Sequence, residues 1–246
     1  MKNKILFIVA THGNEDFSIE VLKKLENVCP KNEYGYDWII GNPRAQEKSV
    51  RYIEKDLNRS APGDITSDIY EEKRAAEIIE ISKNYDCIID VHGTKSDLGI
   101  ITIIPYPTLQ NLLLASLFSI KKNVIWYAKS SLKQGSLVQF VDKPAIEIEC
   151  GPKNDKKIQE DLYIILEKFL TEIKETISLS VLRTIEKKNF YHVYDKLLGE
   201  HNSSLQDFKK TTINKETFYP FLSGNEYKGI TCYKMKKIEF ENLFLT

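Results

Sequence analysis

The chain has 246 residues, of which 42% are apolar and 28% are charged, a balance that is ordinary for a globular protein with a substantial buried core. Lysine plus arginine and aspartate plus glutamate each number 35, so the formal net charge is zero and neither nucleic acid nor a membrane surface is indicated as a partner. Any affinity for an anionic ligand must therefore come from cations gathered locally.

The cysteines and the first residues of the chain indicate a cytoplasmic protein. The four cysteines are scattered without a C-x-x-C pair, which favours reduced thiols over disulfides or a cysteine-rich zinc site. The apolar run at 5–10 is short for a signal-peptide core and leads directly into His12 without a cleavage pattern. Later apolar stretches are too short to span a bilayer.

Apolar periodicity predicts alternating strands and helices over the first 176 residues or so. In chain order, it predicts a strand over 5–10, helices over 17–28 and 68–85, strands over 88–91 and 100–105, a helix over 109–120, strands over 124–128 and 145–150, and a long helix from Asp155. Asp68 and Glu71 have the spacing of a capping box at the start of the second helix. Several strands are apolar on both faces, which is typical of a mostly parallel sheet covered by helices on both sides.

The pattern of apolar and polar residues changes after residue 180. Short aromatic segments at 190–193, 217–222 and 230–233 alternate with polar turns, a pattern that indicates a small β-rich unit. We therefore predict a larger α/β domain over 1–178 and a small β-rich domain over 179–246.

Three residues at strand ends suggest a metal site. His12 and Glu15 directly follow the first strand, and His92 follows the strand at 88–91. Ligands of open α/β sheets gather at the carboxyl ends of the strands, and two histidines with one carboxylate are a ligand set of catalytic zinc. Taken singly, His12 and Glu15 also fit a solvated loop pair, and His92 fits a hydrogen-bonded core histidine; together they predict one zinc ion per chain.

Two carboxylates on the strand at 145–150 are candidates for proton transfer. Glu147 and Glu149 alternate with isoleucines, so both project from one face of the sheet. A carboxylate on a buried strand needs a partner, and a neighbouring metal site would give Glu149 one and make it a general base. Glu149 is preferred because it lies nearer the end of the strand; a salt-bridged edge strand is the alternative.

The segment "GNPRAQEKSVRYIEKDLNRSAPG", residues 41–63, gathers cations. It contains Arg44, Arg51 and Arg59, the last directly preceded by Asn58. Guanidinium groups bind carboxylates with two parallel hydrogen bonds, and an adjacent asparagine adds a directional contact. The segment therefore predicts a carboxylate-binding loop, against the alternative of a polar surface loop with incidental arginines.

These motifs, taken in series, resemble the succinylglutamate desuccinylase/aspartoacylase family, which is related to the zinc carboxypeptidases. THGNE, NPRA with R-Y-x-x-x-D-L-N-R, D-x-H-G and I-E-x-G-P occur in that order over residues 11–152, and "FYPFLSGNEYKG" at 218–229 is a weaker match. The resemblance implies a carboxypeptidase-like α/β/α domain followed by a smaller β domain that narrows the cleft.

The resemblance also implies roles for individual residues. His12, Glu15 and His92 match the zinc ligands, and Glu149 matches the glutamate that transfers protons. The other matches concern the substrate: Arg51 corresponds to the arginine that polarises the scissile carbonyl, Asn58 and Arg59 to the pair that grips the α-carboxylate, and Tyr227 to a substrate-binding tyrosine.

The sequence departs from aspartoacylase-type members in one place. Those members carry an arginine shortly before the strand of the catalytic glutamate, where it reads the second carboxylate of the substrate, whereas residues 132–142 here offer only Lys133. N-acetylaspartate is therefore not implied as the substrate. The expected function is a zinc-dependent hydrolase of the amide bond in a small anionic N-acyl amino acid, in a chain that is a possible homo-oligomer. A carboxypeptidase acting on peptides and a non-catalytic metal- or ligand-binding module are the alternatives.

Overall fold

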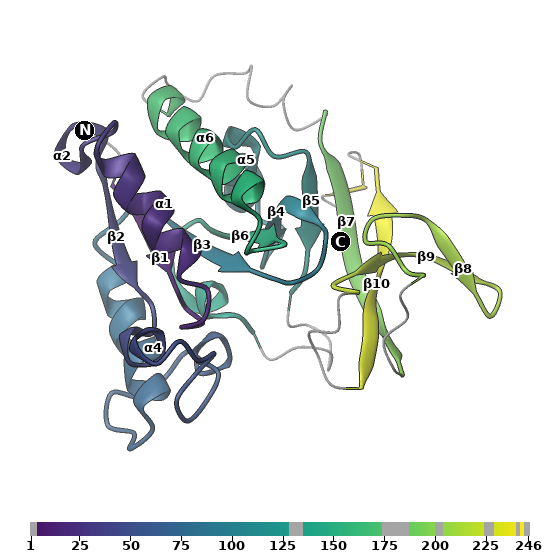
Figure 1. Ribbon diagram of the computed structural model, residues 1–246, viewed down its shortest axis with the longest axis horizontal. Coiled ribbons are helices and arrows are strands. Elements are labelled where there is room, and N and C mark those ends of the chain that lie inside the picture. The colour runs from purple at the N-terminus through teal and green to yellow at the C-terminus, as the bar shows by residue number, and fades with distance from the viewer. Residues whose placement is uncertain are drawn as a thin grey trace.

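A computed structural model describes residues 4–127, 135–173, 187–199, 204–223, 229–239 and 242–243. Its centre is a sheet in the order β2-β1-β3-β6-β4-β5-β7-β10-β9-β8 (Figure 1). The strands are β1 (Ile5–Val9), β2 (Tyr36–Ile40), β3 (Cys87–Gly93), β4 (Gly99–Ile104), β5 (Lys122–Ile125), β6 (Ala145–Gly151), β7 (Asn189–Leu198), β8 (Thr211–Ile213), β9 (Glu216–Phe221) and β10 (Ile230–Ile238). The helices are α1 (Phe17–Glu26), α2 (Lys31–Tyr34), α3 (Pro43–Glu47), α4 (Tyr70–Ser82), α5 (Leu109–Leu117) and α6 (Lys156–Glu172), with 3-10 turns η1 (Leu57–Arg59) and η2 (Leu137–Phe140).

The strands that lead to the predicted metal ligands form the parallel part of the sheet. β2, β1, β3 and β6 are mutually parallel neighbours. All residues of β1 and β3 are buried, as their apolar character on both faces predicts. The sequence pattern missed β2, an edge strand whose sequence YDWII is largely half-exposed and so lacks the strong apolar run of a central strand.

Helices cover both faces of this part of the sheet, which confirms the predicted α/β/α arrangement. Helices α1, α5 and α6 pack on one face, where Leu22, Leu112 and Phe169 join a common apolar core with β1, β3 and β6 (Figure 1). Helix α4 covers the other face through Ala75 and Ile78, together with the 3-10 turns. The carboxyl ends of β1 and β3 thus lie between two packed layers.

The C-terminal strands extend the same sheet. β4 runs antiparallel to β6, β5 and β7 follow β4 in parallel, and β10, β9 and β8 are added in antiparallel pairs. A second apolar cluster spans β4, β5, β7, β9 and β10. The predicted division at residue 178 falls in a part of the chain outside the described residues and stays a prediction.

The predicted capping box of α4 is wrong. Ile69, not Asp68, is the N-cap residue and makes no side-chain capping bond; a carboxylate oxygen of Glu54, from a loop, accepts from the backbone N–H of Tyr70 instead. Glu71 is fully buried and accepts hydrogen bonds from a neighbouring loop instead of turning back on the helix start. The spacing of Asp68 and Glu71 suggested a capping box, but the Glu71 carboxylate binds backbone N–H groups of a loop that comes from another part of the chain.

The cysteines and the lengths of the helices agree with two further predictions. All four cysteines are free and buried, as expected of reduced thiols. Over the described residues, none of the helices has both the length and the apolar character needed to cross a bilayer.

Candidate active site

The loop after β1 is shaped by a backbone turn and a close packing contact. Ala10 adopts a left-handed conformation with φ of 50°, and its carbonyl accepts a 3.0 Å hydrogen bond from the backbone of Asn42. A Cβ atom at Gly13 would lie 2.1 Å from the carbonyl carbon of Ala45, so the loop packs directly on the backbone of α3. THGNE and NPRA, two motifs about thirty residues apart, therefore pack against each other, and His12 and Glu15 of the first motif are buried.

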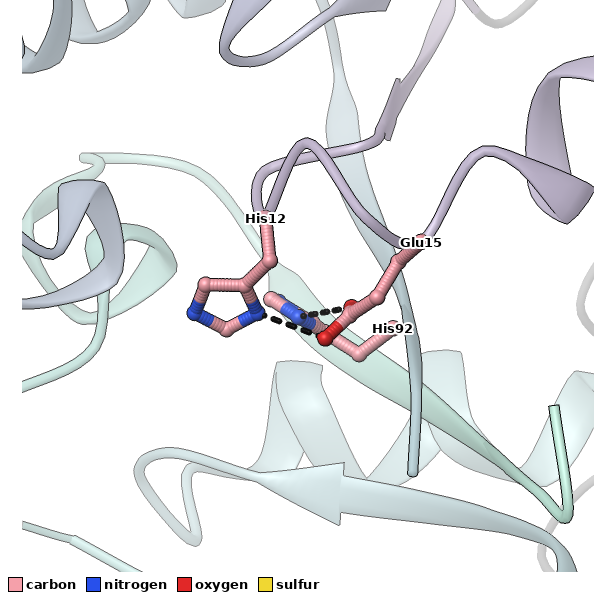
Figure 2. A group of neighbouring side chains, drawn as sticks. All are labelled: His12, Glu15 and His92. Carbon is pink, nitrogen blue, oxygen red and sulfur yellow. Dashed lines mark hydrogen bonds and ion pairs between the residues drawn. The ribbon is translucent and has the colours of Figure 1, made fainter. Parts of the chain in front are cut away.

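The structure brings His12, Glu15 and His92 together. One potential ligand atom of each lies within 4.8 Å of the others, and all three residues are buried. Figure 2 shows both imidazoles directed at the Glu15 carboxylate, one ring nitrogen toward each oxygen. Oε1 lies 2.9 Å from Nδ1 of His12, and Oε2 lies 3.3 Å from Nδ1 of His92. The backbone N–H of Gly93 also donates to Oε2, at 2.9 Å.

Two aspartates lie behind the histidines. Nε2 of His12 is 3.1 Å from Oδ1 of Asp56, and Nε2 of His92 is 2.9 Å from Oδ2 of Asp90, an ion-pair distance without hydrogen-bond geometry. Asp90 is fixed by a 2.8 Å hydrogen bond from the Thr11 hydroxyl. The sequence analysis gave neither aspartate a role, although both stand in the quoted motifs and Asp90, two residues before His92, shares its face of β3.

The charges of this cluster fit a divalent cation. Burial lowers the pKa of His12, but Glu15 and Asp56 have the larger opposite effect, so this pKa is raised. Burial likewise lowers the pKa of His92, but Asp90 and Glu15 raise it well above its usual value. Burial raises the pKa of Glu15, but the two histidines lower it well below its usual range. A buried cluster this rich in carboxylates calls for positive charge, and carboxylates that orient ligand histidines are common around bound metals. The donor set thus suits zinc or a similar divalent ion.

Glu149 lies directly beside the cluster. In the parallel pairing of β3 with β6, Glu149 stands opposite His92, and Glu147 stands opposite Asp90. Burial raises the pKa of Glu149 to about 8; the histidines His92 and His12 oppose this rise, and the negative charges of Glu15 and Glu147 add to it. A carboxyl with a raised pKa in a cleft is suited to exchanging protons with a reacting group.

The loop at 51–59 presents cationic and amide donors to the same cleft. Arg51 donates to Oδ2 of Asp56 through Nε at 3.3 Å and Nη2 at 3.1 Å, and its Nη1 is 3.8 Å from Glu15. Oδ1 of Asn58 accepts a 2.7 Å bond from the backbone of Leu137, so the group it can offer a ligand is its Nδ2 donor. Arg59 donates to the carbonyl of Asn58 at 2.7 Å.

A buried carboxylate anchors this loop from behind. Oε1 of Glu71 accepts from the backbone N–H of Ile53 at 2.7 Å, and Oε2 accepts from those of Glu54 and Lys55 at 3.3 and 3.2 Å. The Asn42 amide donates to the same carboxylate at 3.1 Å, which ties the loop to the end of β2. Glu71 has no counterpart in the sequence predictions except as a helix cap.

One cleft collects most of the predicted site residues. It has an empty volume of about 430 Å³, part of it open to solvent, and is lined by His12, Glu15, Arg51, Asn58, Arg59, His92, Gly93, Thr94, Ile103, Trp126, Glu147, Glu149 and Leu222. Tyr227 and Lys133 lie outside the described residues. Arg44 is not part of the lining; its guanidinium is exposed and stacks 4.1 Å from the centroid of the Tyr70 ring. Ile103, Trp126 and Leu222 are lining residues that the sequence analysis missed, because they carry no motif.

Comparisons with known proteins indicate one family. Residues 2–177 match the family described as the succinylglutamate desuccinylase/aspartoacylase catalytic domain. A probable aspartoacylase of Trichodesmium erythraeum is 25% identical over an alignment of 256 residues, which covers 98% of this chain and 86% of the relative. A probable aspartoacylase of Prochlorococcus marinus (strain MIT 9515) is 34% identical over 188 residues, covering 70% of this chain and 63% of the relative.

A solved structure supports the fold. The crystal structure of murine aminoacylase 3 superposes with a TM-score of 0.76 at 17% identity, covering 96% of both chains. At this identity the likeness concerns the fold, including the C-terminal strands that follow the α/β/α part.

Proposed function

The chain belongs to the succinylglutamate desuccinylase/aspartoacylase family, and on that premise we propose that it is a zinc-dependent hydrolase that cleaves the amide bond of a small N-acyl amino acid. One observation carries the proposal. His12, Glu15 and His92 converge within 4.8 Å of one another in a cleft where Glu149 stands opposite His92. The metal ligands, the candidate base and the groups that can bind a carboxylate therefore all line the same cleft.

The three converging residues would hold the metal. When bound, a divalent ion of this kind supplies Lewis-acid chemistry, lowering the pKa of a bound water and polarising a carbonyl. Asp56 and Asp90 orient the two imidazoles through their outer nitrogens. The identity of the ion as zinc follows from the ligand types and belongs to the proposal.

The chain's own residues supply binding and proton transfer. Arg59 and the Nδ2 donor of Asn58 would bind the α-carboxylate of the substrate, which fixes the amide in place. Glu149 would take a proton from the attacking water and deliver it to the amine nitrogen as the carbon–nitrogen bond breaks, so that an amino acid and a carboxylate leave. Arg51 would face the carbonyl oxygen as negative charge develops there, a contact of a kind whose loss costs about 3 to 4 kcal/mol.

Metal dependence and turnover test the proposal together. The purified protein is stripped with a chelator, reloaded with zinc and assayed on N-acyl amino acids and on short peptides with a free C-terminus. Release of amino acids from the N-acyl compounds that vanishes with chelator and returns with zinc is the expected result. Faster cleavage of the peptides would identify a carboxypeptidase instead, and zinc binding without any turnover would identify a non-catalytic binding module.

A further inference from the structure

The cleft has two chemically different sides. Arg51, Asn58 and Arg59 form one side, which we call the polar wall; Ile103, Trp126 and Leu222 form another, which we call the apolar wall. Apart from the histidines of the metal cluster, the two arginines of the polar wall are the cationic side chains among the described residues that line the cleft. A ligand gripped by its carboxylate at the polar wall therefore has an apolar surface within the same small space.

Aromatic rings of the C-terminal strands pack against Trp126 in the apolar wall. The Trp126 ring lies 5.5 Å from the ring of Phe221 in an edge-to-face contact and 4.6 Å from the ring of Tyr233, centroid to centroid. All three residues of the wall are buried. Fixed aromatic and aliphatic surfaces of this kind bind apolar groups without an ordering cost for the protein.

Leu222 occupies its place at a conformational cost. Its φ of 53° is in the left-handed region, which disfavours a residue with a branched side chain. The backbone N–H of the next residue, Ser223, donates to Oδ1 of Asp207 at 3.0 Å and helps to hold this turn. Strained backbone of this kind concentrates at sites that contact ligands.

Glu147 disfavours a second anionic group in the cleft. It lies two residues before Glu149 on the same face of β6, it is 2% exposed, and it already has an interaction partner. A carboxylate of the substrate placed near it would meet a like charge in a poorly solvated site.

We propose that the apolar wall receives an uncharged apolar group of the substrate, so that the protein prefers N-acyl amino acids carrying such a group over those with a second carboxylate. The inference rests on the proposed deacylase function for the type of ligand. The apolar group comes either from the amino-acid side chain or from the acyl chain, and the two sources can be separated experimentally.

Binding to the zinc-loaded Glu149→Gln variant tests the preference without turnover. The probes for calorimetry are N-acetylleucine, N-hexanoylglycine, N-acetylaspartate and N-acetylornithine, with N-acetylglycine as the reference. We expect one of the first two to bind at least about tenfold more tightly than the reference, and N-acetylaspartate to bind no better than it. Tightest binding of N-acetylleucine assigns the wall to the side chain, and tightest binding of N-hexanoylglycine assigns it to the acyl chain. Tightest binding of N-acetylaspartate or N-acetylornithine, or affinities within about twofold for all probes, overturns the inference.

A second substitution separates specificity from folding. In the Glu149→Gln background, Leu222→Ala should weaken binding of the preferred apolar probe about tenfold and leave binding of N-acetylglycine nearly unchanged. Leu198→Ala, on an exposed side chain of β7, is the matched control and should change neither affinity. An equal loss for both probes would show that Leu222 supports the fold and not the preference. Absence of turnover in the parent together with the expected order of affinities would overturn the deacylase proposal and leave this inference standing.

Discussion

The polar wall of the cleft comes from a loop, whereas the apolar wall comes from sheet strands and the residues that directly follow them. Arg51 and Asn58 depend on hydrogen bonds with Asp56 and Leu137, and the loop that carries them depends on the buried carboxylate of Glu71. Ile103 and Trp126 lie in or directly after β4 and β5, and ring contacts with the C-terminal strands hold Trp126 in place.

The difference shows how each kind of surface is kept in position. A buried charge needs particular hydrogen-bond partners at short range, so single changes in the metal cluster or the polar wall should have large effects on function. An apolar surface is stabilised by many weak contacts, and changes around the C-terminal strands should be felt mainly as changes in stability or preference.

Glu149→Gln should lose nearly all turnover and keep its metal. The amide cannot accept the proton that the carboxylate takes, and removal of a general base typically costs about 100- to 10,000-fold in rate. Steady-state kinetics and metal analysis of the same preparation measure both quantities. Turnover at the rate of the parent would show that another residue is the base.

Gly13→Ala should destabilise the protein and impair metal binding. The new Cβ would lie 2.1 Å from the carbonyl carbon of Ala45, so the loop that carries His12 and Glu15 would have to move. We expect a loss of about 2 to 4 kcal/mol in the free energy of unfolding, measured by denaturant titration of the metal-free protein.

Gly99→Ala is the control for this clash. Gly99, unlike Gly13, has a positive φ, 77°, but a Cβ there would meet nothing within 4 Å. It should cost only about 1 to 2 kcal/mol for the left-handed backbone, without an effect on metal binding. Equal losses in the two variants would contradict the role of packing at Gly13.

Glu71→Gln should lower kcat/KM about tenfold, mainly through KM, at an unchanged metal content. One acceptor oxygen becomes a donor that faces backbone N–H groups, so the loop carrying Arg51, Asn58 and Arg59 loses part of its anchor. Glu80→Gln, on the exposed surface of the same helix, should leave the kinetics unchanged. Hydrogen exchange at Ile53 and Lys55 should quicken only in the first variant; unchanged protection there would refute the anchoring role.

Lys234→Met should lower the melting temperature by a few degrees and leave turnover unchanged. Nζ of Lys234 lies 2.5 Å from Asp195 and 2.9 Å from Glu216, and it lowers the pKa of both half-exposed carboxyls. Lowered pKa values in the folded state stabilise the protein above the unfolded-state values of about 4, and this stabilisation is lost as the pH falls through the folded-state values.

The difference in melting temperature between Lys234→Met and the parent should therefore be present at pH 7 and shrink as the pH falls below about 4. Thermal unfolding followed by circular dichroism across this range measures it. A difference that does not change with pH would show that the lysine acts through packing of its aliphatic stem.

The parallel core of the sheet and the candidate metal ligands could be predicted from the amino-acid sequence alone. Strands such as β1 and β3 are apolar on both faces, and this pattern depends on neighbours in sequence. His12, Glu15 and His92 could be grouped in advance because the ends of parallel strands meet at one edge of a sheet. The motif resemblance then pointed to the family that residues 2–177 match.

The surroundings of those residues depend on contacts between distant parts of the chain and could not be predicted. Glu71 looked like a helix cap because local spacing cannot show a loop that arrives from another part of the chain. The edge strand β2 escaped detection because a half-exposed strand carries a weak pattern. Ile103, Trp126 and Leu222 come together through pairing of strands far apart in sequence, and apolar side chains in strands look alike whether they fill a core or line a cleft.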